Sequence, residues 1–427
     1  MPDVVTTPRR NPMPRALGWL AIPLAALVAC SPGPSPAGPT PSPSAGAASP
    51  AASVDAAAVY AAIAAQVEAI RGLEPKGDVA PVLLDETQLR ANLTADFDTD
   101  NPTAQITASE QVLVTLGLLP VGTSLRQAYL DLQAGQVAGY YSPDRDQLFV
   151  VSRSGAIGAT QRVTYAHEFT HQLQDQNFDL SKLGLDATDQ GDRSLARLSL
   201  VEGDAVATQT AWMSTNLTPQ DIAAVFADAS DPAAVAALEH APAILRTTSL
   251  SPYTDGFAFV GTLKGRGGEA AVNAAFADPP DSTEQILHPE KYLTRERPIA
   301  VTLPAHLETS LGAGWSATAQ DTLGELVLRE WLVEGGVQTT TAATAAAGWG
   351  GDRLELLTGP NGDLALGLVT TWDTAADAAE FALAAGQALS HVHGESRLSM
   401  PAAAATVRVV IATTSGELQD LLGALGG

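Results

Sequence analysis

The sequence has little cysteine, few basic residues and few aromatic residues. Its one cysteine in 427 residues, Cys30, excludes an internal disulfide framework. Lys and Arg number 23 against 47 Asp and Glu, so the formal charge is -24 and no basic surface is available to neutralise nucleic-acid phosphates. Hydrophobic residues still make up 45% of the chain, which allows packed cores, and the length suits two or three domains of about 150 residues each.

The apolar run at 16–29 is shorter than the roughly 20 residues that a membrane-spanning helix needs. It follows three arginines, as the core of a signal peptide does. It ends in Leu27-Val28-Ala29-Cys30, which resembles the lipobox of bacterial lipoproteins, where cleavage exposes the cysteine and lipid is attached to it. The resemblance implies a lipoprotein signal peptide at 1–29, lipidation of Cys30, and an anchor on the extracytoplasmic face of a bacterial cell membrane. The alternatives are an ordinary secretory signal, and a start at Met13 instead of Met1.

Composition divides the rest of the chain. Residues 30–52 are almost entirely Pro, Ser, Ala, Gly and Thr, which cannot bury enough apolar surface to fold, so we expect a disordered tether. The character of the sequence changes again after Pro298. We therefore expect one folded domain at 53–300 and a second at 301–427.

Hydrophobic periodicity and capping residues predict the elements of the first domain. We expect helices at 55–73, 85–95, 107–119, 124–133, 163–176 and 194–213. Short strands are expected at 82–84, 137–141 and 147–151, the last two forming a β-hairpin. The stretch from Tyr253 to Tyr292 has the composition of glycine-rich turns and short helices.

The second domain has a different pattern. It predicts helices at 320–334 and 374–389, strands at 353–358, 364–372 and 406–413, and a final helix. The two domains together predict an α+β fold: a mainly helical domain with a small β-hairpin or sheet, followed by a C-terminal α+β domain.

The motif that carries chemistry is His167-Glu168-Phe169-Thr170-His171. Residues four apart share one face of a helix, so two imidazoles can converge on one Zn²⁺. Glu168 then lies beside a metal-bound water as a general base. The alternative is a chance match on a solvent-facing helix, but the chain has seven histidines and the flanking Val163 and Phe169 indicate a buried helix.

A catalytic zinc needs a third protein ligand, and Glu202 is the best candidate. It lies among Leu200, Val201 and Ala205 on a predicted helix, where an unpaired carboxylate would be costly and a metal would relieve the cost. The alternative is an exposed glutamate on a polar helix face. Asp204 and Asp175 are weaker candidates, either as ligands or as residues that orient a ligand imidazole.

The HExxH motif with a downstream helical glutamate resembles the gluzincin branch of the zincin metallopeptidases, to which thermolysin belongs. Segments 200–205 and 282–292 are similar to a group of bacterial secreted or lipid-anchored metallopeptidases. In thermolysin an Asp follows the glutamate ligand four positions on, whereas Val206 occupies that place here. The resemblance implies a zincin-like fold at 53–300, in which the hairpin at 137–151 supplies an edge strand that pairs with the substrate.

The resemblance also implies zinc-dependent hydrolysis of peptide bonds at the cell envelope. Glu168 would take a proton from the attacking water and deliver it to the leaving amine. A His and a Tyr outside the metal helices serve the oxyanion in thermolysin-like enzymes, and His288 and Tyr253 are the candidates here. The alternative is that His288 caps a helix and Tyr292 packs in the core.

Two other functions stay open from the sequence. One is a zinc hydrolase of other amide bonds, such as those of cell-wall peptides. The other is a non-catalytic lipoprotein that binds proteins or peptides around a structural zinc, for which a base at position 168 would be unnecessary. Apart from a protein or peptide substrate and the membrane, no partner is indicated, and the oligomeric state is not readable.

Overall fold

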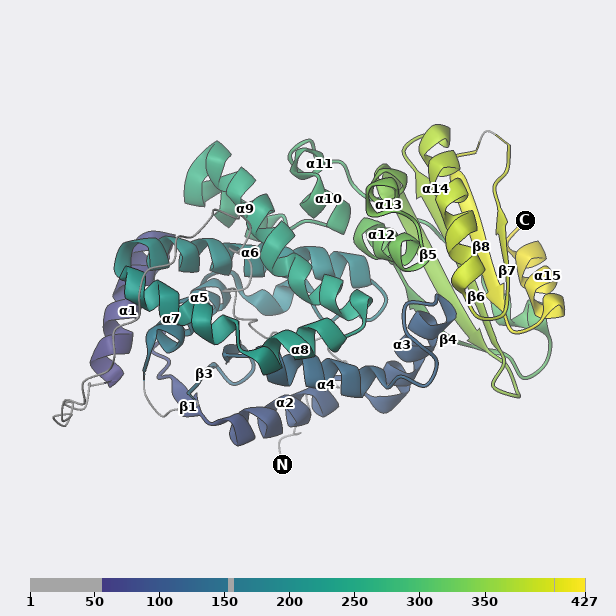
Figure 1. The fold of residues 1–427 in the computed structure, drawn as a ribbon. Helices are drawn as coiled ribbons and strands as arrows, with labels where there is room; N and C mark the ends of the chain where they lie inside the picture. The colour runs from purple at the N-terminus through teal and green to yellow at the C-terminus, as the bar shows by residue number, and fades with distance from the viewer. Residues whose placement is uncertain (1–55, 153–156, 403, 427) are drawn as a thin grey trace, which may run out of the picture.

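The computed structural model describes residues 56–152, 157–402 and 404–426. The expected signal peptide, Cys30 and the tether lie outside these residues. The fold is α+β, as the sequence predicts, with helices filling the first half and a larger sheet in the second (Figure 1). None of the described helices is long and apolar enough to cross a membrane.

The first half contains most of the helices. They are α1 (Ala56–Arg71), α2 (Glu86–Asp100), α3 (Thr103–Thr115), α4 (Leu125–Gln136), α5 (Ala159–Phe178), α6 (Gly191–Asn216), α7 (Pro219–Ala229), α8 (Pro232–His240), α9 (Ala243–Ala277), α10 (Thr283–Leu287) and α11 (Pro289–Leu293), with a 3-10 helix, η2 (Leu180–Leu183). Side-chain caps begin α2 and α4: Asp85 accepts a hydrogen bond from the backbone of Gln88, and Ser124 accepts one from the backbone of Gln127.

A three-stranded sheet lies beside these helices. Strands β2 (Gly139–Ser142) and β3 (Gln147–Val151) form the predicted hairpin, and β1 (Val82–Leu84) pairs in parallel with β3. The order β1-β3-β2 leaves β2 at an edge.

The second half is built on a five-stranded antiparallel sheet of order β4-β5-β6-β8-β7. Its strands are β4 (Ser316–Asp321), β5 (Trp349–Thr358), β6 (Leu364–Trp372), β7 (Glu395–Ser399) and β8 (Thr406–Ala412). Its helices are α12 (Gly324–Glu334), α13 (Thr339–Ala346), α14 (Ala375–Ala388) and α15 (Ser415–Ala424), with 3-10 helices η3 (Leu307–Leu311) and η4 (Leu389–His391). Helices α12 to α14 cover one face of the sheet and α15 the other (Figure 1).

The two halves share one continuous core. Leu116, Leu132 and Ile244 from the first half pack in the same hydrophobic cluster as Trp331 and the inner face of the large sheet. The indole Nε1 of Trp331 also donates to the backbone carbonyl of Leu116 over 2.9 Å. This contact joins α12 of the second half to the end of α3 in the first half.

Two predictions about element boundaries are wrong. The helix expected at 107–119 begins at Thr103, because Thr107 is interior to the helix, where its hydroxyl donates to the carbonyl of Thr103 instead of capping. The helix expected at 320–334 begins at Gly324, and its first residues belong to the edge strand β4. That strand is largely exposed and therefore lacks the alternating apolar pattern that reveals a strand.

The turns and short helices expected from Tyr253 to Tyr292 are found only in part. Tyr253 lies in the long first segment of α9, whose backbone is not helical at Gly267 and Gly268, and the short helices α10 and α11 follow. Gly256 lies inside α9 because this helix crosses α6 in backbone contact there. A Cβ at Gly256 would meet the carbonyl oxygen of Ser199 at 2.2 Å, and a Cβ at Gly203 would meet that of Gly256 at 2.2 Å. The glycines thus serve a close helix crossing, not a turn.

Candidate metal centre

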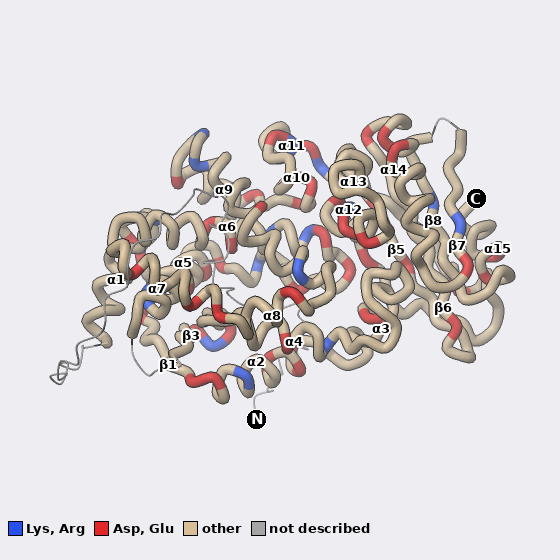
Figure 2. Tube along the Cα trace, in the orientation of Figure 1, with Lys and Arg blue, Asp and Glu red and all other residues tan. Residues whose placement is uncertain are grey.

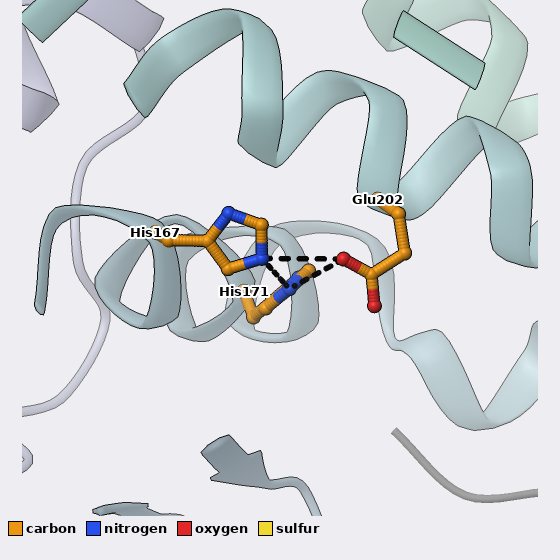
Figure 3. Close-up of side chains that lie close together, drawn as sticks. All are labelled: His167, His171 and Glu202. Carbon is orange, nitrogen blue, oxygen red and sulfur yellow. Dashed lines mark hydrogen bonds and ion pairs between the residues drawn. The ribbon is translucent and has the colours of Figure 1, made fainter. Parts of the chain in front are cut away.

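Helices α5 and α6 lie antiparallel and bring the three predicted metal ligands together. His167 and His171 project from one face of α5, and Glu202 faces them from α6 (Figure 3). The Nε2 atom of His167 lies 3.1 Å from that of His171 and 3.2 Å from Glu202 Oε2. The Nε2 atom of His171 lies 3.3 Å from the same oxygen. All three side chains are buried.

These separations fit a single tetrahedral metal ion. Ligands about 2.0–2.1 Å from a tetrahedral zinc lie about 3.3 Å from one another. The three measured distances fall between 3.1 and 3.3 Å. The residues present therefore match the donor set and the spacing of a zinc site with two nitrogens and one oxygen.

Hydrogen bonds on the far side of each imidazole set its tautomer. His171 Nδ1 lies 2.9 Å from Gln174 Oε1, and Gln174 Nε2 donates to Val201 O and Asp204 Oδ2. That amide oxygen is therefore an acceptor, so Nδ1 of His171 carries the hydrogen. His167 Nδ1 faces Gln209 Oε1 in the same way, at 2.9 Å. Both Nε2 lone pairs then face the carboxylate, which is the tautomer that a metal requires.

Without a cation this arrangement is electrostatically costly. Two nitrogen lone pairs would face an anionic oxygen inside a buried site. Burial lowers the pKa of the His171 imidazole, but Glu202 outweighs burial and raises it to about 9. Burial likewise raises the pKa of the Glu202 carboxyl, but the two imidazoles outweigh it and lower the value to about 2. In the absence of a metal a proton would lie among these atoms, and metal binding would displace it.

Glu168 follows His167 on α5 and lies next to the metal ligands. Its side chain is buried, and neither carboxylate oxygen has a hydrogen-bond partner of good geometry in the described structure. Burial raises its pKa, and His167 and His171 partly oppose the shift. The backbone N–H of Tyr141 in β2 also opposes it. A carboxylate with a raised pKa beside a metal-ligand cluster has the properties of a general base.

Strand β2 presents its free edge to this site. The carbonyl of Ala138 accepts from the N–H of Val151, and Tyr140 pairs with Phe149 two residues further on. Because hydrogen-bonded pairs alternate along antiparallel strands, the N–H and C=O groups of Gly139 and Tyr141 point away from β3. Gly139 also packs tightly on α5, since a Cβ there would meet Thr164 Cγ2 at 2.5 Å.

The close crossing of α6 and α9 places Tyr253 at the site. Its ring stacks on that of His167, with centroids 6.1 Å apart and planes 23° apart. The aromatic side chain is buried and packs on Val206, the residue that replaces the Asp of the thermolysin pattern. Tyr253 therefore lies beside the metal ligands, as the sequence suggests, but on a helix instead of a turn.

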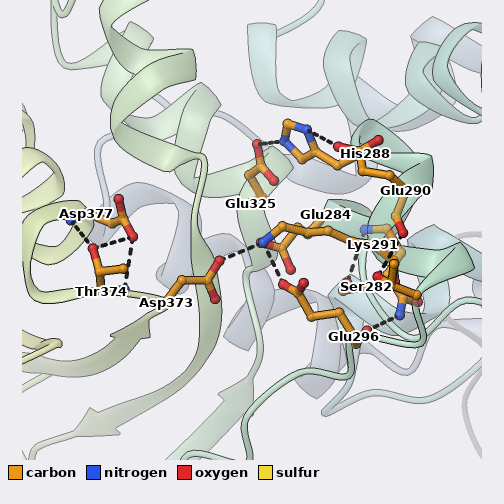
Figure 4. Close-up of polar contacts among 12 residues, drawn as sticks. Ser282, Glu284, His288, Glu290, Lys291, Glu296, Glu325, Asp373, Thr374 and Asp377 are labelled. Atoms are coloured by element: carbon orange, nitrogen blue, oxygen red, sulfur yellow. Dashed lines mark hydrogen bonds and ion pairs between the residues drawn. The ribbon is translucent and has the colours of Figure 1, made fainter.

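His288 does not lie at the metal centre. Its Nε2 hydrogen-bonds Glu325 of α12 over 3.0 Å, close to a cluster in which Lys291 Nζ contacts three carboxylates at 2.7 Å each (Figure 4). The three carboxylates belong to Glu284, Glu296 and Asp373. His288 is the C-cap residue of α10, and Tyr292 packs in the core of α6 and α9. The prediction of His288 as an oxyanion donor is wrong because its segment turns toward the second half of the chain.

A buried network supports the His171 side of the centre. Asp204 Oδ2 accepts from Gln174 at 2.9 Å and from Arg71 Nε at 2.8 Å, and both ionic side chains are fully buried. Arg71 Nη1 also contacts Glu269 of α9 at 3.2 Å. Asp204 thus orients an imidazole through Gln174, whereas Asp175 binds the Tyr141 hydroxyl and the Leu180 N–H. Neither aspartate is among the residues that converge on the metal position.

A cavity of about 630 Å³ opens onto the centre. Glu202, Tyr253 and Tyr141 line it at the metal centre. Helices α2 to α4, the tip of the hairpin and the first turns of α6 form its walls, and residues 319–323 of the second half border it as well. Of the candidate ligands, Glu202 lines this cavity, which is large enough for a peptide segment.

Comparisons with known proteins cover the second half of the chain. A family model described as a domain of unknown function (DUF8575) matches residues 309–421, which span the large sheet, α12 to α14 and most of α15. No curated protein and no solved structure matches the chain. The matched segment contains none of the candidate ligands, so the case for the metal centre depends on its geometry.

Sequence reasoning overlooked three residues of the site. Gln174 and Gln209 accept from the ligand imidazoles, and Arg71 neutralises Asp204. Gln174 lies three residues after His171 on one helix face, so helical spacing alone would have identified it. Arg71 left no comparable signal, because its partner is 133 residues away in the sequence.

Proposed function

We propose that the protein is a zinc-dependent metallopeptidase, with His167, His171 and Glu202 as the metal ligands and Glu168 as the general base. The observation that carries the proposal is the separation of the three ligand atoms, 3.1 to 3.3 Å, together with imidazole tautomers that leave both Nε2 lone pairs pointing inward. A structural zinc site would use four protein ligands, whereas three leave a position open for water and substrate.

A bound zinc ion would supply Lewis acidity, which polarises a carbonyl group and makes water easier to deprotonate. The chain supplies the proton transfers. Glu168 accepts a proton from the attacking water, and its raised pKa lets it hold that proton and return it to the leaving amine. Gln174 and Gln209 keep the ligand imidazoles in one orientation throughout.

The surroundings support a peptide substrate. An extended peptide could add to the free edge of β2 through the backbone groups of Gly139 and the carbonyl of Tyr141, a common mode of peptide recognition. Tyr253, beside His167, is the candidate donor for the negative charge that develops on the carbonyl oxygen.

The site gives less support to two other functions. A zinc hydrolase of other amide bonds, such as those of cell-wall peptides, would use the same residues and differs only in substrate. A non-catalytic zinc lipoprotein would not need Glu168, a buried carboxylate beside the metal ligands, because a structural site requires no base.

The protein would act at the outer face of a bacterial cell membrane, held by lipid on Cys30. This part of the proposal depends on the lipobox-like Leu27-Val28-Ala29-Cys30 segment alone. Expression of Cys30→Ala, followed by membrane fractionation, tests it. The variant should leave the membrane fraction or accumulate unprocessed, and an unchanged membrane-bound mature form would contradict the anchor.

The central test is metal analysis of the purified full chain combined with cleavage of a peptide library. We expect one zinc per chain. Glu202→Ala should lose most of the metal, whereas Glu168→Gln should keep it and lose hydrolysis. Glu380→Gln, on the exposed face of α14, is the control for a lost carboxylate. Undiminished turnover in Glu168→Gln would refute the peptidase mechanism.

A further inference from the structure

Arg71, the last residue of α1, is a fully buried cation. Basic positions are sparse along the trace, and acidic positions outnumber them (Figure 2). Arginine is almost never fully buried unless it is paired. The Nε of Arg71 donates to Asp204 Oδ2 on α6 at 2.8 Å, and its Nη1 lies 3.2 Å from Glu269 Oε2 on α9. One side chain thus joins the end of α1 to both helices that bring Glu202 and Tyr253 to the metal centre.

The carboxylate of Asp204 links Arg71 to a metal ligand. Its Oδ2 accepts from Gln174 Nε2 at 2.9 Å as well as from Arg71. The amide of Gln174 therefore turns its oxygen toward Nδ1 of His171, 2.9 Å away. The carbonyl of Val201 accepts from the same amide nitrogen at 3.0 Å. Two side chains, each held by a hydrogen bond, separate Arg71 from the His171 imidazole.

Helix α1 also packs directly on the helices that carry the ligands. Ile63 and Val67 share one face of α1 and lie in the same hydrophobic cluster as Phe169 of α5. The indole Nε1 of Trp212 on α6 donates to Gln66 Oε1 at 2.8 Å. Helix α1 is therefore docked on α5 and α6, and its last residue is the point at which this docking reaches the ligand network.

Loss of Arg71 from its place would leave Asp204 buried without its cation. Breaking a buried ion pair is costly because the remaining charge is uncompensated, and the carboxylate would be driven toward water and away from Gln174. The carbonyl of Val201 would then hold the Gln174 amide alone, and the tautomer of His171 would be less well fixed. Outer partners of ligand histidines account for about 10–100-fold in metal affinity, and we expect the lower end because Val201 remains.

We propose that Arg71 is a positioning residue of the metal centre, through which the docking of helix α1 controls how tightly the centre binds zinc. The proposal rests on the proposed function, because it names a means of regulating the same metal site. Coupling between two equilibria is reciprocal, so bound zinc also holds α1 in its docked position, by the same factor.

Competition against a chromophoric chelator measures the zinc affinity of the full-length chain in detergent. Arg71→Met should bind zinc about 10-fold more weakly than the unmodified chain. Adding Asp204→Asn removes the uncompensated charge and supplies a neutral acceptor for Gln174, so most of the lost affinity should return. A packing role of Arg71 would not be rescued in this way.

Ile63→Ala is the matched control for the loss of stability. It opens a cavity under the same helix, where Ile63 is buried against α5, and leaves Arg71 and Asp204 in place. Its zinc affinity should equal that of the unmodified chain. Gln174→Leu cuts the network between Asp204 and His171, so adding Arg71→Met to it should weaken zinc binding no further.

Hydrogen exchange measures the reciprocal effect on α1. Saturating zinc should slow the exchange of the α1 backbone amides by about 10-fold in the unmodified chain, the same factor as the affinity change. The amides of α15, which packs on the other face of the large sheet, are the reference for any effect of zinc on the whole chain. In Gln174→Leu, zinc should slow α1 no more than it slows α15.

The outcomes separate the two proposals. Zinc affinity of Arg71→Met equal to that of Ile63→Ala would overturn the role of Arg71, and so would a loss that Asp204→Asn does not reverse. An equal effect of zinc on α1 and α15 in the unmodified chain would overturn the control by α1. Absence of zinc binding in the unmodified chain would overturn both proposals. The expected pattern in a chain that cleaves no peptide would support the role of Arg71 and contradict the peptidase.

Discussion

Replacing Gln209 by leucine tests whether the tautomer of His167 controls metal binding. The substitution preserves side-chain size in a buried position and removes the acceptor of the Nδ1 hydrogen, which lies 2.9 Å from Gln209 Oε1. The imidazole then has two choices. It can keep a buried N–H without a partner, which costs about 1–3 kcal/mol, or it can move the hydrogen to Nε2, which then cannot bind a metal.

Either choice weakens zinc binding. Outer partners of ligand histidines typically account for a factor of about 10–100 in metal affinity. At about 1.4 kcal/mol per tenfold change, this range is roughly 1.4–2.8 kcal/mol, which agrees with the cost of one unsatisfied N–H. We therefore expect Gln209→Leu to bind zinc about 10–100-fold more weakly than the unmodified chain.

A competition titration against a chromophoric chelator at pH 7 measures this affinity. Gln209→Glu restores an acceptor and should bind zinc at least as tightly as the unmodified chain. Gln172→Leu is the control, because Gln172 is buried on the same metal helix but donates to Gly77 O, away from the ligands. Zinc affinity of Gln209→Leu within twofold of the Gln172→Leu control would refute the reasoning. Equal weakening in Gln209→Glu would show that packing, not proton acceptance, is what matters.

Three further predictions follow from other parts of the site. Tyr253→Phe should keep zinc and lower kcat by roughly 10²–10³-fold, because it removes a hydroxyl and leaves the ring on His167; unchanged kcat in a peptide-cleavage assay would assign Tyr253 to packing alone. Arg71→Met should lower the free energy of unfolding in urea by about 3–5 kcal/mol, because it leaves Asp204 buried without its cation, and adding Asp204→Asn should recover part of that loss; equal stability of the single and double variants would contradict this. Burial raises the pKa of Asp321 to about 7 and that of Asp352 to about 6, so between pH 7 and pH 4 the folded chain binds protons that the unfolded chain has released. The free energy of unfolding in excess chelator should therefore be higher at pH 5 than at pH 7. A steady decrease in this free energy as the pH falls over that range would contradict the assignment.

The sequence determined the parts of the site that depend on local geometry. The spacing of His167 and His171 places them on one face of any helix that contains them, and Glu168 accompanies them whatever the rest of the chain does. Glu202 was predictable because a carboxylate among apolar neighbours needs a partner. The hairpin at 137–151 was predictable for the same local reason, since turn residues separate two apolar segments.

Tertiary structure alone decided how these pieces meet. Glycine is typical of turns, yet Gly256 lies in α9, where its missing Cβ lets the backbone of α6 come close. That helix crossing brings Tyr253 next to His167. His288 lies away from the metal centre, where its Nε2 forms a hydrogen bond with Glu325, 37 residues further along the chain. Asp321, which comes from the other half of the chain, accepts from the N–H of Gly191 at the start of α6 and borders the cavity. Periodicity and capping are properties of neighbouring residues and can be read from one sequence. Helix crossings and buried ion pairs join residues far apart in the chain, and one sequence does not show which of them will meet.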